Sequence, residues 1–134
     1  MLFRSMDVLI PDRTVFDTVQ DALPLKGIGV IRNLCAAFLF SGDDVDKQIK
    51  LLSGGEKSRV VLAGILGRPV NFLVLDEPTN HLDIQSREVL LKALADFKGT
   101  IVLVSHDRHF LRSLVDRVFE IDHGEMTTYE GDYE

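Results

Sequence analysis

Two short apolar runs in the second half of the chain constrain its fold more than any other feature. Residues 72–75 (Phe-Leu-Val-Leu) and 101–104 (Ile-Val-Leu-Val) contain no polar side chain. Such runs are typical of strands covered on both faces. Between them, residues 84–97 carry apolar side chains at helical spacing. A strand, a helix and a second strand predict parallel pairing within an α/β layer.

The rest of the sequence predicts helices before this unit and mixed elements after it. Three helices are expected first, over residues 15–23, 28–40 and 54–66. Two of them follow Thr14 and Ser53, which are good N-cap residues. A short helix and two strands are expected last, over residues 108–114, 118–121 and 126–129. The sequence therefore predicts a helical subdomain over residues 12–68 and an α/β part over residues 69–134.

Composition and the start of the chain exclude several classes of protein. Residues 1–11 follow no periodic pattern, so we interpret them as an irregular start that reflects truncation or an artefact. They do not form a signal peptide, and no apolar run is long enough to span a membrane. The single cysteine, Cys35, excludes an internal disulfide and fits a reducing cytosol. The net charge of −6 disfavours a large nucleic-acid-binding surface.

Two adjacent carboxylates, Asp76 and Glu77, directly follow the first apolar run. Ligands of open α/β sheets bind at the carboxyl ends of the strands, where these side chains are expected. One carboxylate can hold a water bound to Mg²⁺ while the other orients or deprotonates an attacking water. Acidic residues also end strands simply as turn formers. The pair is therefore a candidate site that needs support from other residues.

A histidine follows the second apolar run in the same way. His106 lies just beyond the expected tip of that strand, so it could face the same ligand as Glu77. A histidine after a strand is also commonly a loop residue satisfied by backbone groups. The spacing of His106 and His109 resembles that of metal ligands, but no cysteine or placed third ligand accompanies it. We do not expect a zinc site.

The third candidate site is the stretch Ser-Gly-Gly-Glu at residues 53–56, at the expected start of a helix. Gly54 and Gly55 expose backbone N–H groups, Ser53 can donate from its hydroxyl, and the helix dipole favours an anion. The alternative is a capping motif with no ligand. No phosphate-gripping GxxxxGK[ST] loop occurs in the 134 residues, so any phosphate bound here would have to be held elsewhere.

Four motifs resemble, in order and spacing, those of the ATP-binding cassette (ABC) ATPases. They are LSGGE (residues 52–56), FLVLDEP (72–78), TNHLD (79–83) and VSHD (104–107). They correspond to the signature motif, the Walker B motif, the D-loop and the switch histidine. The sequences DEPTNHLD and SHDRHFL resemble those of the ABC-F branch, whose soluble tandem-cassette members act on ribosomes. The resemblance implies an α/β, P-loop NTPase-like partial core with a mostly parallel sheet, preceded by the helical subdomain.

The resemblance implies roles for individual residues. Asp76 would belong to the Mg²⁺ shell, Glu77 would be the catalytic carboxylate, and His106 would contact the γ-phosphate of ATP. Asp83 would lie across an interface between cassettes. The stretch from Ser53 through Gly54 and Gly55 to Glu56 would bind the γ-phosphate of ATP held by a second cassette, packed head to tail. The cofactors implied are ATP and Mg²⁺, the partners a second cassette and the ribosome, and the location the cytoplasm.

The sequence departs from the ABC family in its first half. The Walker A loop, its lysine and its strand are absent. By resemblance, that strand belongs between residues 100–104 and 117–121. We therefore expect the C-terminal part of one cassette, inactive as an ATPase by itself and prone to self-association. Two alternatives remain open: a fragment of the nucleotide-binding subunit of an ABC transporter, and a non-enzymatic interaction module.

Overall fold

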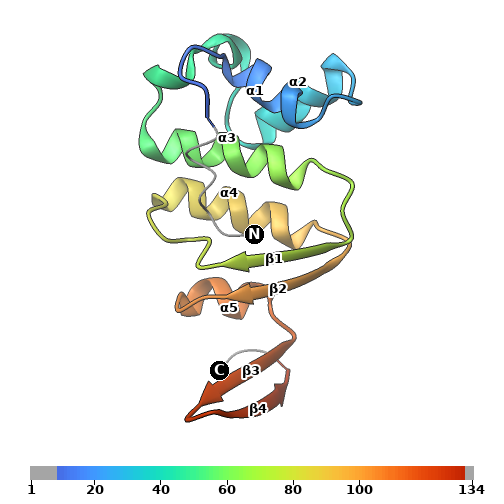
Figure 1. Cartoon of the computed structure of the whole chain (residues 1–134), viewed down its shortest axis with the longest axis vertical. Coiled ribbons are helices and arrows are strands. Elements are labelled where there is room, and N and C mark those ends of the chain that lie inside the picture. The colour runs from blue at the N-terminus through green and yellow to red at the C-terminus, as the bar shows by residue number, and fades with distance from the viewer. Residues whose placement is uncertain (1–8, 132–134) are drawn as a thin grey trace.

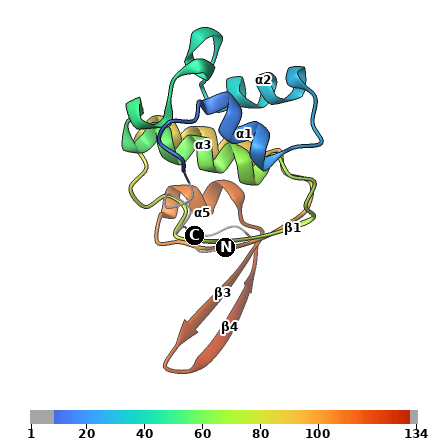
Figure 2. The same ribbon diagram turned by 45° about the horizontal axis from the view of Figure 1, so that its top comes forward.

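The computed structural model describes residues 9–131 and stacks its elements along one axis (Figure 1). Helices α1 (Val15–Ala22), α2 (Ile28–Ala37) and α3 (Gly54–Leu66) lie at one end, and we call them the helical subdomain. Helix α4 (Ile84–Ala95) and the strands β1 (Phe72–Asp76) and β2 (Thr100–Val104) follow, with α5 (Arg108–Leu114) on the helix side of the strands (Figure 2). The hairpin of β3 (Arg117–Asp122) and β4 (Glu125–Glu130) projects from the other end. The irregular start expected over residues 1–11 falls mostly outside the described residues.

The helices of the subdomain agree with the sequence predictions. Their bounds are α1 Val15–Ala22, α2 Ile28–Ala37 and α3 Gly54–Leu66, with short 3₁₀ turns at Gly42–Asp46 and Ile49–Leu51. Thr14 caps α1, because its side chain accepts a hydrogen bond from the Asp17 N–H at 3.1 Å. Helix α2 ends three residues earlier than expected from residues 28–40, where Leu39 adopts a left-handed backbone with φ 69°. A helix cannot continue through that conformation.

One hydrophobic core joins the subdomain to the α/β part. Val19 of α1, Leu62 of α3, Leu90 of α4 and Phe110 of α5 are each no more than 2 % exposed and belong to this core. Cys35 is also fully buried there, as expected for a small apolar side chain, and burial raises the pKa of its thiol. The subdomain and the first strands therefore form one packed unit.

The predicted parallel pair is present. Strand β1 covers Phe72–Asp76 and strand β2 covers Thr100–Val104, and Val74 lies opposite Val102 in parallel register. Helix α4, Ile84–Ala95, makes the connection between them. Leu73 and Leu75 face the helices and are nearly fully buried. The α/β fold class predicted from the sequence is confirmed.

Burial of these strands on both faces was a wrong prediction for the described residues. Phe72, Val102 and Val104 point away from the helices and are 55 %, 46 % and 51 % exposed. The helices occupy one side of the strand pair (Figure 2), and no described element covers the other side. An apolar strand loses its solvent contact only where a second layer packs on it, and residues 9–131 supply no such layer.

The strand expected over residues 118–121 does not join the parallel layer, although the prediction had it there. Helix α5, Arg108–Leu114, leads to β3, Arg117–Asp122, which pairs with β4, Glu125–Glu130, in an antiparallel hairpin. Gly124 in the turn has a φ of 82°, which favours glycine. Strands β2 and β3 belong to separate two-stranded sheets. The expectation that a further strand belongs between them is compatible with this arrangement.

The exposed apolar face of β1–β2 leads us to expect self-association of the isolated chain. Such a face lowers its free energy by covering itself with another copy. Sedimentation should show concentration-dependent oligomers, and a Phe72→Glu, Val102→Glu variant should need about tenfold higher concentration to form them. Leu25→Glu is the control, because Leu25 is 97 % exposed on the helical subdomain. A sharp monomer peak for the unmodified chain at all concentrations would contradict this prediction.

Candidate functional site

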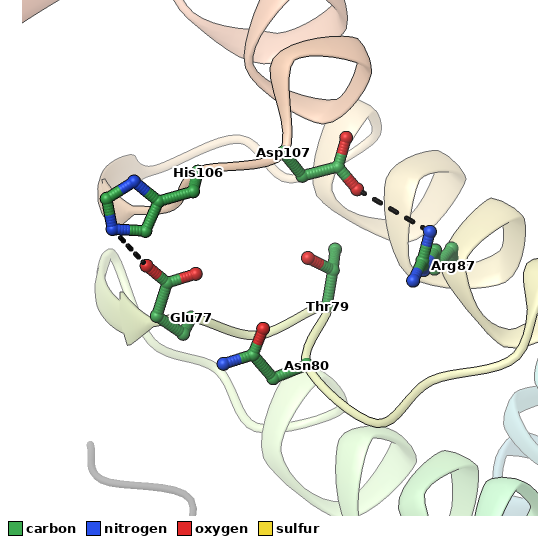
Figure 3. A pocket seen from close by; sticks show the side chains of 6 residues that line it. All are labelled: Glu77, Thr79, Asn80, Arg87, His106 and Asp107. Carbon is green, nitrogen blue, oxygen red and sulfur yellow. Dashed lines mark ion pairs between the residues drawn. The ribbon is translucent and has the colours of Figure 1, made fainter.

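An open pocket of about 400 Å³ lies at the carboxyl ends of β1 and β2. Its walls come from the loop after β1, the first turns of α4 and the loop after β2 (Figure 3). The lining side chains are all polar: Glu77, Thr79, Asn80, Arg87, His106 and Asp107. This is the position at which ligands bind in open α/β sheets. The structure therefore brings two sequence-predicted residues, Glu77 and His106, to one pocket.

Glu77 and His106 point toward each other across the mouth of the pocket (Figure 3). His106 Nε2 lies 3.3 Å from Glu77 Oε1, and this contact is an ion pair when the imidazole is protonated. The His106 side chain is 96 % exposed and that of Glu77 only 24 %. Water therefore screens the pair from the histidine side, while the carboxylate is partly sheltered. An entering ligand can meet both groups at once.

The backbone of Glu77 is held in an uncommon conformation. Its φ is 47°, in the left-handed region that residues with side chains seldom occupy. Its N–H donates to the Val104 carbonyl at 2.7 Å, and its carbonyl accepts from the Asn80 N–H at 3.2 Å. Strained residues of this kind cluster at functional sites, where surrounding contacts hold them. The two bonds fix the point at which the Glu77 side chain leaves the strand.

Asp76 is the last residue of β1 and lies opposite Val104 in the sheet register. Its side chain is exposed and does not line the pocket, so the two adjacent carboxylates have different surroundings. No group of three or more potential metal ligands occurs among residues 9–131. Mg²⁺ is commonly held by one or two carboxylates, waters and substrate phosphates. The carboxylates fit Mg²⁺ that arrives with a phosphate ligand.

Sequence reasoning missed four of the pocket residues: Thr79, Asn80, Arg87 and Asp107. Asp107 caps α5 by accepting from the Phe110 N–H at 3.1 Å, and its other oxygen lies 4.0 Å from Arg87 Nη1. Thr79, Asn80 and Asp107 stand within the quoted motifs TNHLD and VSHD, which was a usable signal. Arg87 had none, because its position depends on the direction of α4.

The Ser-Gly-Gly-Glu stretch forms a second cluster at the start of α3. The Ser53 hydroxyl accepts from the Glu56 N–H at 3.2 Å, and the Glu56 carboxylate accepts from the Ser53 N–H at 3.2 Å. This is a reciprocal capping box. The stretch therefore does cap the helix. The cap satisfies the Glu56 N–H, and the hydrogen of the Ser53 hydroxyl can still donate to an anion.

Asp83 lies beside this cluster and begins the next helix. Its Oδ1 accepts from the Ser86 N–H at 2.7 Å, which caps α4. Hydrogen bonding from Ser86 holds the pKa of the Asp83 carboxyl below its usual range. The stabilising effect of this cap is therefore present above the unfolded pKa of about 3.9 and is lost as pH falls through the lower, folded pKa.

These elements define the class of protein. Parallel strands that end in Asp-Glu and in Ser-His-Asp, joined to a helical subdomain whose last helix starts with Ser-Gly-Gly, form the architecture of an ATP-binding cassette. A family model described as "ABC transporter" matches residues 1–80. The chain belongs to the ABC transporter family.

Curated proteins of the same family resemble the chain over most of its length. It is 47 % identical over 126 residues to the ATP-binding protein YdiF of Bacillus subtilis, covering 94 % of this chain and 20 % of YdiF. It is 45 % identical over 122 residues to ABC transporter F family member 2 of Arabidopsis thaliana, covering 91 % of this chain and 18 % of that protein. The chain thus spans about a fifth of the length of the curated relatives it matches.

A solved structure confirms the fold. It is a dimer of an ATP-binding cassette in a post-hydrolysis state, bound to ADP and Pi. It matches 96 % of this chain and 60 % of its own, with a TM-score of 0.73 and 22 % identity. Over residues 9–131, no helix is long and apolar enough to cross a membrane.

Proposed function

We propose that these residues form the hydrolytic half of an ATP site. Asp76 holds Mg²⁺ through water, Glu77 acts as the catalytic carboxylate, and His106 contacts the γ-phosphate. The observation that carries the proposal is the 3.3 Å contact between Glu77 and His106 at the ends of two parallel strands. A carboxylate beside a histidine can orient and deprotonate a water while the imidazole donates to a phosphate oxygen. The Mg²⁺ supplied with ATP offsets phosphate charge.

The Ser-Gly-Gly-Glu cluster serves a different ATP molecule in this proposal. Ser53, Gly54, Gly55 and Glu56 lie at the start of α3, and none of them lines the pocket of Glu77. A helix start with an available hydroxyl favours an anion held by another surface. A second cassette, packed head to tail, provides that ATP. Asp83, beside Gly55, then lies at the interface between the two cassettes.

The target that we propose for cassette closure is the ribosome, as in a translation factor. Support comes from the F-family relatives and from the TNHLD wording at residues 79–83, which resembles the ribosome-associated branch. The competing fragment of a transporter subunit uses the same ATP chemistry on a different partner. Association with ribosomes or with membranes therefore separates the two.

We expect the isolated chain to bind Mg·ATP weakly. The backbone N–H groups and the lysine of a phosphate-binding loop normally make most of the phosphate contacts, and the 134 residues contain no such loop. Calorimetric titration should show no saturation in the micromolar range for the chain. A full-length cassette protein that carries the same residues should saturate. Micromolar affinity of the chain would contradict the proposed division of the site, and no binding by the full-length protein would contradict the function itself.

A further inference from the structure

Helices α3 and α4 begin in direct contact, and the contact is made by Gly55 and Asp83. A Cβ atom on Gly55 would lie 2.6 Å from Asp83 Oδ2, 3.2 Å from its Cγ and 3.7 Å from Ser86 Oγ. Non-bonded carbon atoms are comfortable at about 3.5–4.0 Å. The Asp83 carboxylate therefore occupies the space that a side chain at position 55 would need.

The Asp83 carboxylate cannot leave this space without loss. Its Oδ1 caps α4 through the Ser86 N–H, and Ser86 is fully buried. The buried guanidinium of Arg59, one turn further along α3, also attracts the negative charge of Asp83. Turning the carboxylate away from α3 would break the cap and move it from that positive charge.

The neighbouring glycine has a different environment. A Cβ on Gly54 would meet no atom within 4 Å. Both glycines belong to the first turn of the same helix, and both are expected to expose backbone N–H groups to an anion. Only Gly55 is also required by a carboxylate of its own chain. The two positions therefore form a matched pair for experiment.

Asp83 is connected to Glu77 through a packed turn. The Leu82 N–H donates to the Thr79 carbonyl at 3.2 Å, and the Asn80 N–H donates to the Glu77 carbonyl at 3.2 Å. Thr79 and Leu82 are 4 % and 6 % exposed, so this turn has little room to deform. This turn therefore joins Asp83 to the segment that bears Glu77.

We propose that Gly55 is a positioning residue. By lacking a side chain, it lets the start of α3 lie against the capped start of α4, and so holds the turn that carries Glu77 at a fixed distance from the Ser53 cluster. The assignment of Glu77 and Ser53 to two ATP molecules rests on the proposed function. The contact between Gly55 and Asp83 then keeps Glu77 and the Ser53 cluster of one chain at a constant distance from each other. Its need for glycine is independent of any nucleotide.

Hydrogen exchange of the full-length protein without nucleotide tests this proposal. In Gly55→Ala, amides in the first turn of α4, residues 84–87, should exchange roughly fivefold faster, as for the loss of an N-cap. Gly54→Ala should leave their exchange unchanged, although alanine is the better helix former at both positions. Adding Asp83→Ser to Gly55→Ala should restore slow exchange, because serine still caps a helix but lacks the second carboxylate oxygen.

The outcomes separate the alternatives. Unchanged exchange in Gly55→Ala, or an increase that Asp83→Ser does not reverse, would overturn the positioning role. If Gly55→Ala fails to fold, folded protein should be recovered when Asp83→Ser is added, because this change removes the same steric conflict. A failure to recover folded protein would contradict the positioning role. Failure of the unmodified full-length protein to hydrolyse ATP would overturn the proposed function. It would leave the exchange result intact, because no nucleotide is present in that experiment.

Discussion

Glu77→Gln, placed in a full-length cassette protein that carries these residues, should lower ATP turnover by about 100-fold or more. ATP binding should stay within about threefold of the unmodified protein, because glutamine keeps the size and hydrogen bonding of the side chain. The variant lacks only the basic oxygen that would take a proton from the attacking water. Steady-state phosphate release and nucleotide titration measure the two quantities separately.

Glu88→Gln is the matched control for this prediction. Glu88 lies on α4, and its carboxylate is 3.8 Å from Nε2 of His109, a histidine that does not line the pocket of Glu77. The same change of charge at this position should leave turnover within about twofold, as for an ordinary surface substitution. Turnover in Glu77→Gln that persists within about threefold would contradict the catalytic role proposed for Glu77.

The same variant tests the proposed partner. Under the proposed function, a cassette protein that binds ATP without hydrolysing it should accumulate with its two cassettes closed. If closure acts on the ribosome, Glu77→Gln should sediment with ribosomes when ATP is present and should be released when ATP is removed. Recovery with membranes instead of ribosomes would favour the transporter-subunit alternative.

Ser53→Arg should abolish closure and turnover in the full-length protein while the ATP site on its own cassette keeps its affinity. A long side chain at the start of α3 would occupy the space that the proposal gives to the phosphate of the opposing ATP. Cross-linking or light scattering of the closed cassette pair, with turnover, measures the effect. The loss should be large, because a blocked interface cannot assemble either shared site.

The capping role of Ser53 makes a different prediction, and a second substitution separates the two. Losing the cap costs about 1 kcal/mol of stability and should impair both sites through the fold. Ser53→Asp keeps a good N-cap but places a negative charge where the phosphate would sit. Normal melting temperature with lost closure in Ser53→Asp supports the phosphate role. Unaffected closure would leave Ser53 as a cap only.

The local elements could be predicted from the sequence because short-range rules decide them. Thr14 caps α1 and Ser53 caps α3, as their residue types indicate. The polar residues after two apolar strands also indicated where a pocket would lie. Parallel strands end at the same edge of a sheet, so His106 could face the same ligand as Glu77, and the structure places His106 Nε2 3.3 Å from Glu77 Oε1.

Long-range contacts could not be predicted in the same way. Arg87 lines the pocket only because α4 runs past the loop after β2, and no local pattern encodes that direction. Which side chains of the apolar strands are exposed, here Phe72 and Val102, is likewise not encoded by the strands themselves. An apolar strand carries the same residues whether or not a second layer packs on it. Its burial therefore depends on segments that are distant from it in the sequence.

The sequence by itself determined the order of elements, the caps of the helices and the family to which the chain belongs, since each depends on residue types at short spacing. Tertiary structure alone decided which of two adjacent glycines is sterically required. Gly54 faces open space and Gly55 faces the Asp83 carboxylate, 28 positions along the chain, and only the packing of α3 against α4 brings them together.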